Sequence, residues 1–88
     1  MTFRSKENIE NIRSMPCSIC MFPQPSDPHH WKSKGSGGDD SLDNLVSLCH
    51  PHHQEFHNTG RTTFFNKYGT KINNFRKRNQ LPEIKETK

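Results

Sequence analysis

The chain has 88 residues, of which 27% are apolar, and its formal net charge is +4. This length suits one domain, but so few apolar residues exclude a large hydrophobic core, and no segment approaches the roughly 18 apolar residues of a membrane span. The polar start lacks the apolar run of a secretory signal and predicts a cytoplasmic protein, in which thiols stay reduced. The three cysteines therefore indicate metal binding or chemistry rather than disulfides. The positive charge suits an anionic partner such as nucleic acid, or a solvated basic surface.

The first third of the chain predicts one short helix and then irregular structure. Residues 5–14 favour a helix that Ser5 caps and that ends before Pro16. Residues 17–28 contain a Cys-x-x-Cys pair and three prolines. This composition indicates a knuckle followed by an irregular loop.

The middle of the chain predicts a loose hairpin followed by a helix. Residues 29–34 favour a first strand and residues 42–48 the returning strand, with a glycine-rich turn between them. Pro51 is well tolerated at the first position of a helix, so we expect His50 to cap that helix and Gly60 to end it.

Residues 61–88 predict a helical segment that passes into a basic tail. Aromatic and aliphatic residues recur at helical spacing from Thr62 onward and are interrupted by Gly69. We expect Trp31, Phe56 and Phe64 to pack in the small core. The basic residues that together could contact phosphates, although each alone is expected to be solvated, are Lys32, Lys34, Arg61, Lys67, Lys71, Arg76, Lys77 and Arg78.

Two pairs of potential metal ligands repeat the same gap of two residues. Cys17 pairs with Cys20, and Cys49 pairs with His52. This gap lets both side chains of a pair reach one ion, and four such ligands suit tetrahedral Zn²⁺ with no position left for water. We therefore expect a structural Cys₃His zinc site that joins the base of the hairpin to the following helix. The alternative is three small core cysteines and a surface histidine.

A second group of histidines remains after the zinc site is assigned. His53 and His57 are four residues apart on the predicted helix and can bind one ion from the same face. The pair His29 and His30 can supply a third ligand. We expect the nearby prolines to relax the alternation of the strand, so that one of these two binds metal while the other faces a substrate. The alternative is a histidine-rich surface tract.

The segment HHWKSKGSGGDDSLDNLVSLCHPHHQEFH resembles the His-Asn-His (HNH) nuclease motif, with His30, Asn44 and His53 in its three defining positions. The Cys-x-x-Cys and Cys-x-x-His pairs resemble the zinc-stapled members of this family. The double histidine resembles the DNase domains of colicins and small phage nucleases. The resemblance implies an α+β protein with the small ββα-metal fold and flanking helices, one domain over residues 1–88 with its core at about 17–60. It also implies the cytoplasm of a bacterium or of a phage-infected cell.

The activity that this resemblance implies is metal-dependent DNA cleavage. His30 would be the general base, and His29, His53 and also His57 would hold a divalent ion. Asn44 would bond the backbone across the hairpin and so brace His30. Many members of the family have an aspartate where this chain has His29, and an all-imidazole site suits Zn²⁺, Ni²⁺ or Mn²⁺ better than Mg²⁺. The sequence does not choose among these four ions.

The expected partner is DNA, read with low sequence specificity or with specificity that a protein partner supplies. No membrane partner is expected. Asp39, Asp40 and Asp43 lie around the glycine-rich turn and are expected to be solvated and outside the site. The alternative function is a non-catalytic zinc module that binds nucleic acid or protein, which needs only the Cys₃His site.

Overall fold

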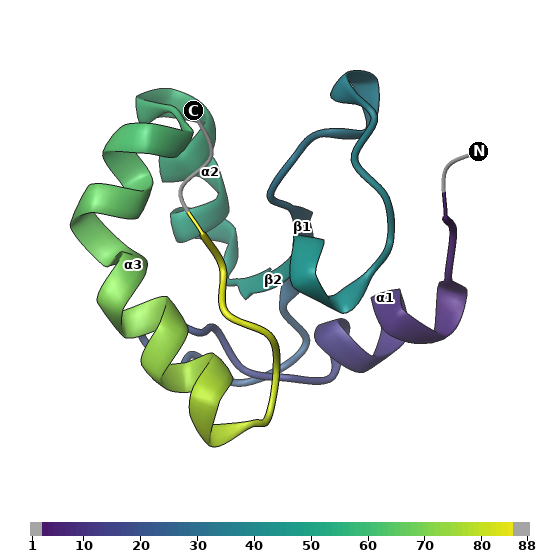
Figure 1. Cartoon of the computed structure of the whole chain (residues 1–88). Helices are drawn as coiled ribbons and strands as arrows, with labels where there is room; N and C mark the ends of the chain where they lie inside the picture. Colours follow the sequence, from purple (N-terminus) through teal and green to yellow (C-terminus); the bar gives the residue numbers. More distant parts are fainter. Residues whose placement is uncertain (1–2, 86–88) are drawn as a thin grey trace.

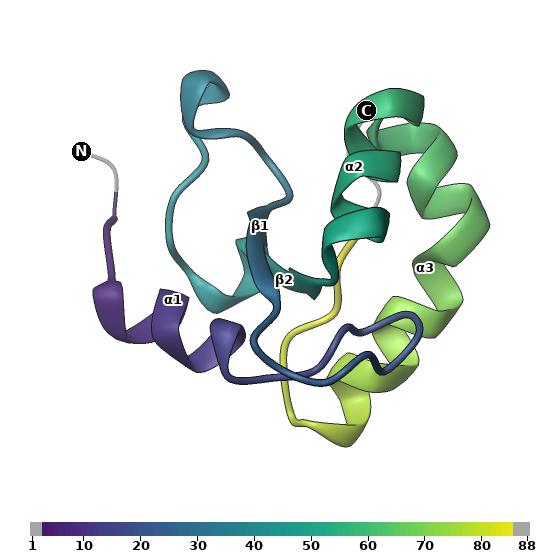
Figure 2. The same ribbon diagram turned by 180° about the vertical axis from the view of Figure 1, so that it is seen from behind.

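A two-stranded antiparallel sheet lies between helices in the computed structural model, which describes residues 3–85 (Figure 1). In chain order, the elements are α1 (Lys6–Arg13), β1 (Asp27–His30), the 3₁₀ turns η1 (Lys34–Ser36) and η2 (Leu42–Asn44), β2 (Leu45–Leu48), α2 (His50–Thr59) and α3 (Arg61–Arg78). Helix α1 lies on one side of the hairpin, and α2 and α3 lie on the other (Figure 2). The predicted α+β class is confirmed.

The register of the hairpin separates the two consecutive histidines. His29 pairs with Val46, and His30 pairs with Leu45. Cross-strand partners share a face of the sheet, and neighbours along a strand alternate. Val46 belongs to the core that α3 covers, so His29 faces that side and His30 faces the other. The expected relaxation of the alternation is wrong, because both histidines lie within the regular part of β1.

Both strands differ from their predicted bounds. Strand β1 begins at Asp27 and includes Pro28, which we expected in an irregular loop, and it ends before the lysines of the predicted strand 29–34. Pro28 is tolerated because β1 is an edge strand with a single partner. Strand β2 is shorter than the predicted 42–48, because residues 42–44 form the 3₁₀ turn η2 instead. Within this turn the Asn44 side chain accepts a hydrogen bond from the backbone N–H of Lys32.

The helix ends follow local capping chemistry. The Ser5 side chain accepts a hydrogen bond from the backbone N–H of Asn8 at 3.1 Å, as its position predicted. The N-cap of α2 is Cys49, one residue earlier than the expected His50. This shift places a predicted zinc ligand at the exact start of the helix that carries the other histidines. Gly60, with φ of 88°, ends α2 and permits the sharp change of direction into α3.

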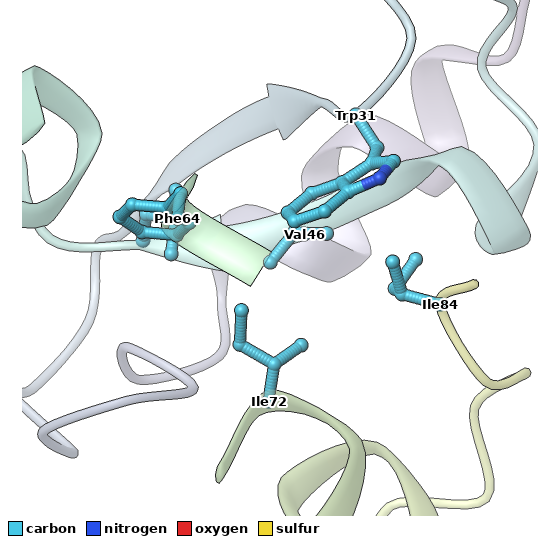
Figure 3. Packing of buried hydrophobic residues seen from close by; sticks show 6 residues of the cluster. Trp31, Val46, Phe64, Ile72 and Ile84 are labelled. Carbon is cyan, nitrogen blue, oxygen red and sulfur yellow. The ribbon is translucent and has the colours of Figure 1, made fainter. Parts of the chain in front are cut away.

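The hydrophobic core includes a residue from the C-terminal segment that the sequence predicts to be polar and basic. Trp31, Val46, Phe64 and Ile72 pack together with Ile84, which is 1% exposed (Figure 3). Figure 1 shows the chain after α3 running back across the molecule. The predicted interruption of α3 at Gly69 is also wrong, since the helix is continuous there.

Arg76 is a second departure from the expected basic tail. Its side chain, expected to be solvated or on phosphate, is buried, and its guanidinium donates to three backbone carbonyls. The acceptors are those of Pro82 at 2.5 Å, Leu45 at 2.7 Å and Leu42 at 2.5 Å. Burial lowers the pKa of Arg76 to about 10, so the group remains charged near neutral pH. Arg76 thus joins α3, the segment after it and the start of β2.

Candidate functional site

The four predicted ligands of the first centre meet in space. The ligand atoms of Cys17, Cys20, Cys49 and His52 all lie within 4.8 Å of one another. Sγ of Cys17 is 3.6 Å from Nδ1 of His52, and Sγ of Cys20 is 3.8 Å from Sγ of Cys49. Tetrahedral zinc with its usual bond lengths separates such atoms by about 3.5 to 3.8 Å. The Cys₃His cluster therefore fits a metal ion such as Zn²⁺.

The electrostatics of these thiols also suit a cation. Burial opposes ionisation of Cys17, but the backbone N–H groups of Cys20, Cys49 and Ile19 outweigh it, so the pKa of Cys17 lies below its ordinary value. The pKa of Cys49 is raised to about 11, first by burial and then by the neighbouring thiols of Cys17 and Cys20. A cation bound among these thiols would favour their ionised forms. All three cysteines are free.

The predicted histidines of the second centre also converge. The ligand nitrogens of His29, His53 and His57 lie within 4.8 Å of one another. Nε2 of His53 is 3.3 Å from Nε2 of His57, close to the separation of about 3.3 Å that two imidazoles have on one tetrahedral zinc ion. Strand β1 supplies the first of these residues and helix α2 the other two. The set can hold one metal ion and leaves a position for a ligand from outside.

His29 gives the clearest sign that this cluster suits an ion. The residue is 6% exposed, and its buried Nε2 has no hydrogen-bond partner among the described residues. Burial, followed by the neighbouring His53 and His57, lowers the pKa of His29 to about 3. The imidazole is therefore neutral at pH 7. A buried nitrogen without a partner is costly, and a metal ion bound at this nitrogen would remove that cost.

Asp27 is a residue of this centre that sequence reasoning missed. Its Oδ2 lies 3.1 Å from Nδ1 of His53. When Nδ1–H donates to this carboxylate, the other nitrogen of His53 presents its lone pair toward His57, an arrangement common behind metal-bound histidines. Asp27 precedes His29 by two residues and so shares its face of the strand. That spacing was a usable signal, but the surrounding prolines had indicated a loop.

The Asn44 amide spans the loop that follows β1. Its Oδ1 accepts a hydrogen bond from the backbone N–H of Lys32 at 2.7 Å. Its Nδ2 donates to the carbonyl of Lys32 at 3.1 Å and to that of Asp39 at 2.9 Å. The backbone N–H of Trp31 also donates to the Asn44 carbonyl at 2.8 Å. These bonds fix the chain directly after His30.

His30 lies apart from the histidine cluster and contacts a buried carboxylate. Its Nε2 is 2.7 Å from Oδ1 of Asp40. The same carboxylate accepts hydrogen bonds from the backbone N–H of Ser5 at 2.9 Å and from the guanidinium of Arg4 at 3.1 Å. The hydrogen bond with His30, then that from Ser5, and then Arg4 lower the pKa of Asp40 to about 2. Asp40 is therefore a charged acceptor near neutral pH.

The expectation that all three aspartates of the turn are solvated is wrong for Asp40. Asp40 is only 3% exposed, because the segment that leads into α1 covers it. Asp39 and Asp43 are partly or fully exposed and bond the Ser41 hydroxyl. A glycine-rich turn gives no local sign of this difference. The burial of Asp40 depends on a segment 35 residues away along the chain.

Over residues 3–85 the chain thus forms a small α+β protein with a two-stranded antiparallel sheet, three α-helices and a Cys₃His cluster that can bind metal. No protein-family model, curated protein or solved structure matches it. Among the described residues 3–85, none of the helices combines the length and the apolar character needed to span a bilayer.

Proposed function

We propose that the protein is a metal-dependent endonuclease of the HNH type that hydrolyses phosphodiester bonds in DNA. The observation that carries this proposal is the convergence of His29, His53 and His57 on one point. Three protein ligands with a further position open are typical of catalytic metal sites, whereas structural sites have four. His57 is exposed, so a substrate can approach this cluster from solvent. In this proposal β1, β2 and α2 form the ββα-metal core.

His30 would act as the general base. Its Nε2 faces Asp40, so Nδ1 is the ring nitrogen left for contact with a water molecule. Nδ1 would accept a proton from a water molecule as the water oxygen attacks phosphorus. The bond from phosphorus to the 3′ oxygen then breaks, and this oxygen takes a proton from solvent, which leaves 5′-phosphate and 3′-hydroxyl ends. A divalent ion, when bound, would offset the charge that develops on the phosphate and the departing oxygen.

The edge of β1 offers a place where one substrate could reach both histidine environments. Because β1 pairs only with β2 among the described strands, its other edge has no partner strand. A phosphodiester bound along that edge would lie between the two faces of the strand, with the cluster of His29 on one face and His30 on the other. Asn44 supports this assignment, because its bonds to Lys32 and Asp39 hold the chain next to His30.

The Cys₃His cluster would hold structural Zn²⁺ and join the Cys-x-x-Cys knuckle to α2. The all-imidazole set would take Zn²⁺, Ni²⁺ or Mn²⁺ more readily than Mg²⁺. The net charge of +4 suits DNA bound through its phosphates with low sequence specificity. The cytoplasm of a bacterium or of a phage-infected cell is the setting that the HNH resemblance implies.

A plasmid-cleavage assay tests the proposal. Wild-type protein, the His30→Ala variant and the His50→Ala control would be assayed with Mg²⁺, Mn²⁺, Ni²⁺, Co²⁺ and Zn²⁺. His50 is an exposed histidine outside the cluster that contacts it only through Asp27, whose Oδ2 lies 3.5 Å from Nδ1 of His50. The His30→Ala variant should lose about 10²- to 10⁴-fold in rate while it retains both metals, because only proton transfer is removed.

Two outcomes would contradict the proposal in different ways. Cleavage by His30→Ala at the wild-type rate would remove His30 from the mechanism. Absence of cleavage by the wild type with every ion would favour the non-catalytic zinc module. Equal loss of activity in the His50→Ala control would mean that the loss in His30→Ala is not specific to His30.

A further inference from the structure

The carboxylate of Asp40 is held by donors from two distant parts of the chain. Oδ1 lies 2.7 Å from Nε2 of His30 and 3.1 Å from the Arg4 guanidinium, and Oδ2 accepts the Ser5 backbone N–H at 2.9 Å. The side chain of Asn8, on α1, also donates to the Asp40 main-chain carbonyl at 2.9 Å. The side chain of Asp40 is 4% exposed. The carboxylate is thus buried and fixed in orientation before any substrate binds.

We propose that Asp40 is the positioning residue of the general base, an inference that rests on the proposed nuclease function. An ionised carboxylate can only accept hydrogen bonds. The nitrogen of His30 that faces Asp40 must therefore carry the proton, which leaves the lone pair on Nδ1. Asp40 selects the tautomer of His30 that can take a proton from water.

The same contact would serve the step after proton transfer. Once Nδ1 has taken the proton from water, both nitrogens of His30 carry hydrogen and the ring is positively charged. A charged donor and a charged acceptor form a stronger hydrogen bond than neutral groups do. Asp40 would therefore stabilise the charged ring as it forms. Ser5 and Arg4 keep the carboxylate in place, which gives the segment preceding α1 a role in the site.

A purely structural role for Asp40 is the competing explanation, because the residue also joins α1 to the loop after β1. The two roles can be separated through Asn8. The Asn8→Ala variant removes a hydrogen bond between α1 and the main chain of Asp40 but leaves the carboxylate and its contact with His30. It is therefore the matched control for Asp40→Asn.

The first test reads the tautomer directly in the full-length, zinc-loaded wild type. Long-range ¹H–¹⁵N correlation spectra of the neutral ring distinguish a proton on Nε2 from one on Nδ1. We expect the His30 proton on Nε2. A proton on Nδ1 would overturn the inference, whether or not the protein cleaves DNA and whether or not any Asp40 variant folds.

The second test compares variants in the same spectra and in the cleavage assay. An asparagine can donate its amide N–H to Nε2, so Asp40→Asn should shift His30 toward the Nδ1–H tautomer. It should lower kcat by about 10²-fold or more, within the contribution of general-base catalysis, with little change in KM or metal content. Asn8→Ala should keep the Nε2–H tautomer and the wild-type kcat. Asp40→Glu, which retains a carboxylate, should keep more activity than Asp40→Asn.

The outcomes separate this inference from the proposed function. If the wild type cleaves DNA and Asp40→Asn keeps both the wild-type tautomer and kcat, the positioning role is overturned while the nuclease proposal stands. Equal losses of kcat in Asn8→Ala and Asp40→Asn, without a tautomer shift, would overturn it in favour of the structural role. A tautomer shift in Asp40→Asn together with a wild type that never cleaves DNA would overturn the nuclease proposal and, with it, a role for Asp40 in catalysis.

Discussion

The two metal-ligand clusters differ in the number and kind of their ligands rather than in burial, because each has an exposed member, Cys20 in the first and His57 in the second. The first cluster offers four ligands, three of them thiols, and the second offers three imidazoles. Both share helix α2, where His52 belongs to one set and its neighbour His53 to the other. Adjacent residues of one helix can therefore contribute to two kinds of metal site: one with four protein ligands, which suits stability, and one with three protein ligands and a free position, which suits chemistry.

The largest expected effect is loss of the fold when the first cluster is disrupted. Cys17→Ser should abolish the cooperative thermal transition, because metal-binding energies of about 10 to 16 kcal/mol in such sites exceed or equal the stability of a typical small domain. Circular dichroism melts with a zinc assay measure this effect. His57→Ala, from the other cluster, is the control and should melt cooperatively with its zinc in place. A folded, zinc-free Cys17→Ser protein would contradict the distinction between the clusters.

A smaller effect is expected when a ligand of the second cluster is removed. His57→Ala should weaken metal binding at the second cluster by more than about 100-fold. Substitution of a residue that only hydrogen-bonds to a metal ligand typically costs about 10- to 100-fold, and loss of a ligand itself should cost more. Isothermal titration of the zinc-loaded protein with Mn²⁺ or Ni²⁺ gives this affinity. Unchanged affinity would exclude His57 from the site and leave it as a histidine near the end of α2.

The Asp27→Asn variant tests a residue that contacts the proposed metal ligand His53 without being a ligand itself. Since Asp27 contacts Nδ1 of His53 rather than the nitrogen that faces the cluster, we expect affinity at the second cluster to fall about 10- to 100-fold. The zinc content of the first cluster should not change. The same titration measures the effect, with Asp43→Asn, an exposed aspartate of the turn, as the control. Equal affinities for the two variants would assign Asp27 no part in holding the metal.

The smallest expected effect is a pH dependence of stability that His29 causes. The unfolded chain binds a proton at this residue near its ordinary pKa of 6.5, whereas the folded chain, with the second cluster metal-free, does so only at about 3. Acidification through this window therefore destabilises the fold, by about 1.4 kcal/mol between pH 7.5 and 5.5. Urea unfolding of zinc-loaded protein at the two pH values measures the loss. His29→Met should reduce it, and an equal loss in this variant would assign the dependence to other groups.

The sequence predicts the ligand pairs within both sets because each pair depends on short, regular spacing, whereas His29 rather than His30 was expected as the third imidazole only from the HNH resemblance. The gaps of two residues in the Cys₃His set and of four residues between His53 and His57 determine which side chains can share an ion. The helix boundary at Gly60 was likewise predictable from local chemistry, and the structure confirms it.

The remaining features depend on contacts between distant segments. Asp40 becomes buried only because Ser5 and Arg4 reach across to it. Ile84 looked like part of a polar tail, and its place in the core requires the chain to turn back after α3. No spacing rule for single helices or strands contains such information, and the polar neighbours of both residues favoured an exposed position.

The position of Arg76 in the chain has a consequence for the order of assembly. The residues of both metal clusters, from Cys17 to His57, precede Arg76 and Ile84. During synthesis, earlier segments emerge first. Metal ions can therefore bind the knuckle, the hairpin and α2 before the guanidinium is available to bond the carbonyls of Leu42 and Leu45. The turn that carries Asn44 would then be the last part of the candidate site to become ordered, so a nascent chain could bind metal ions before this turn is fixed.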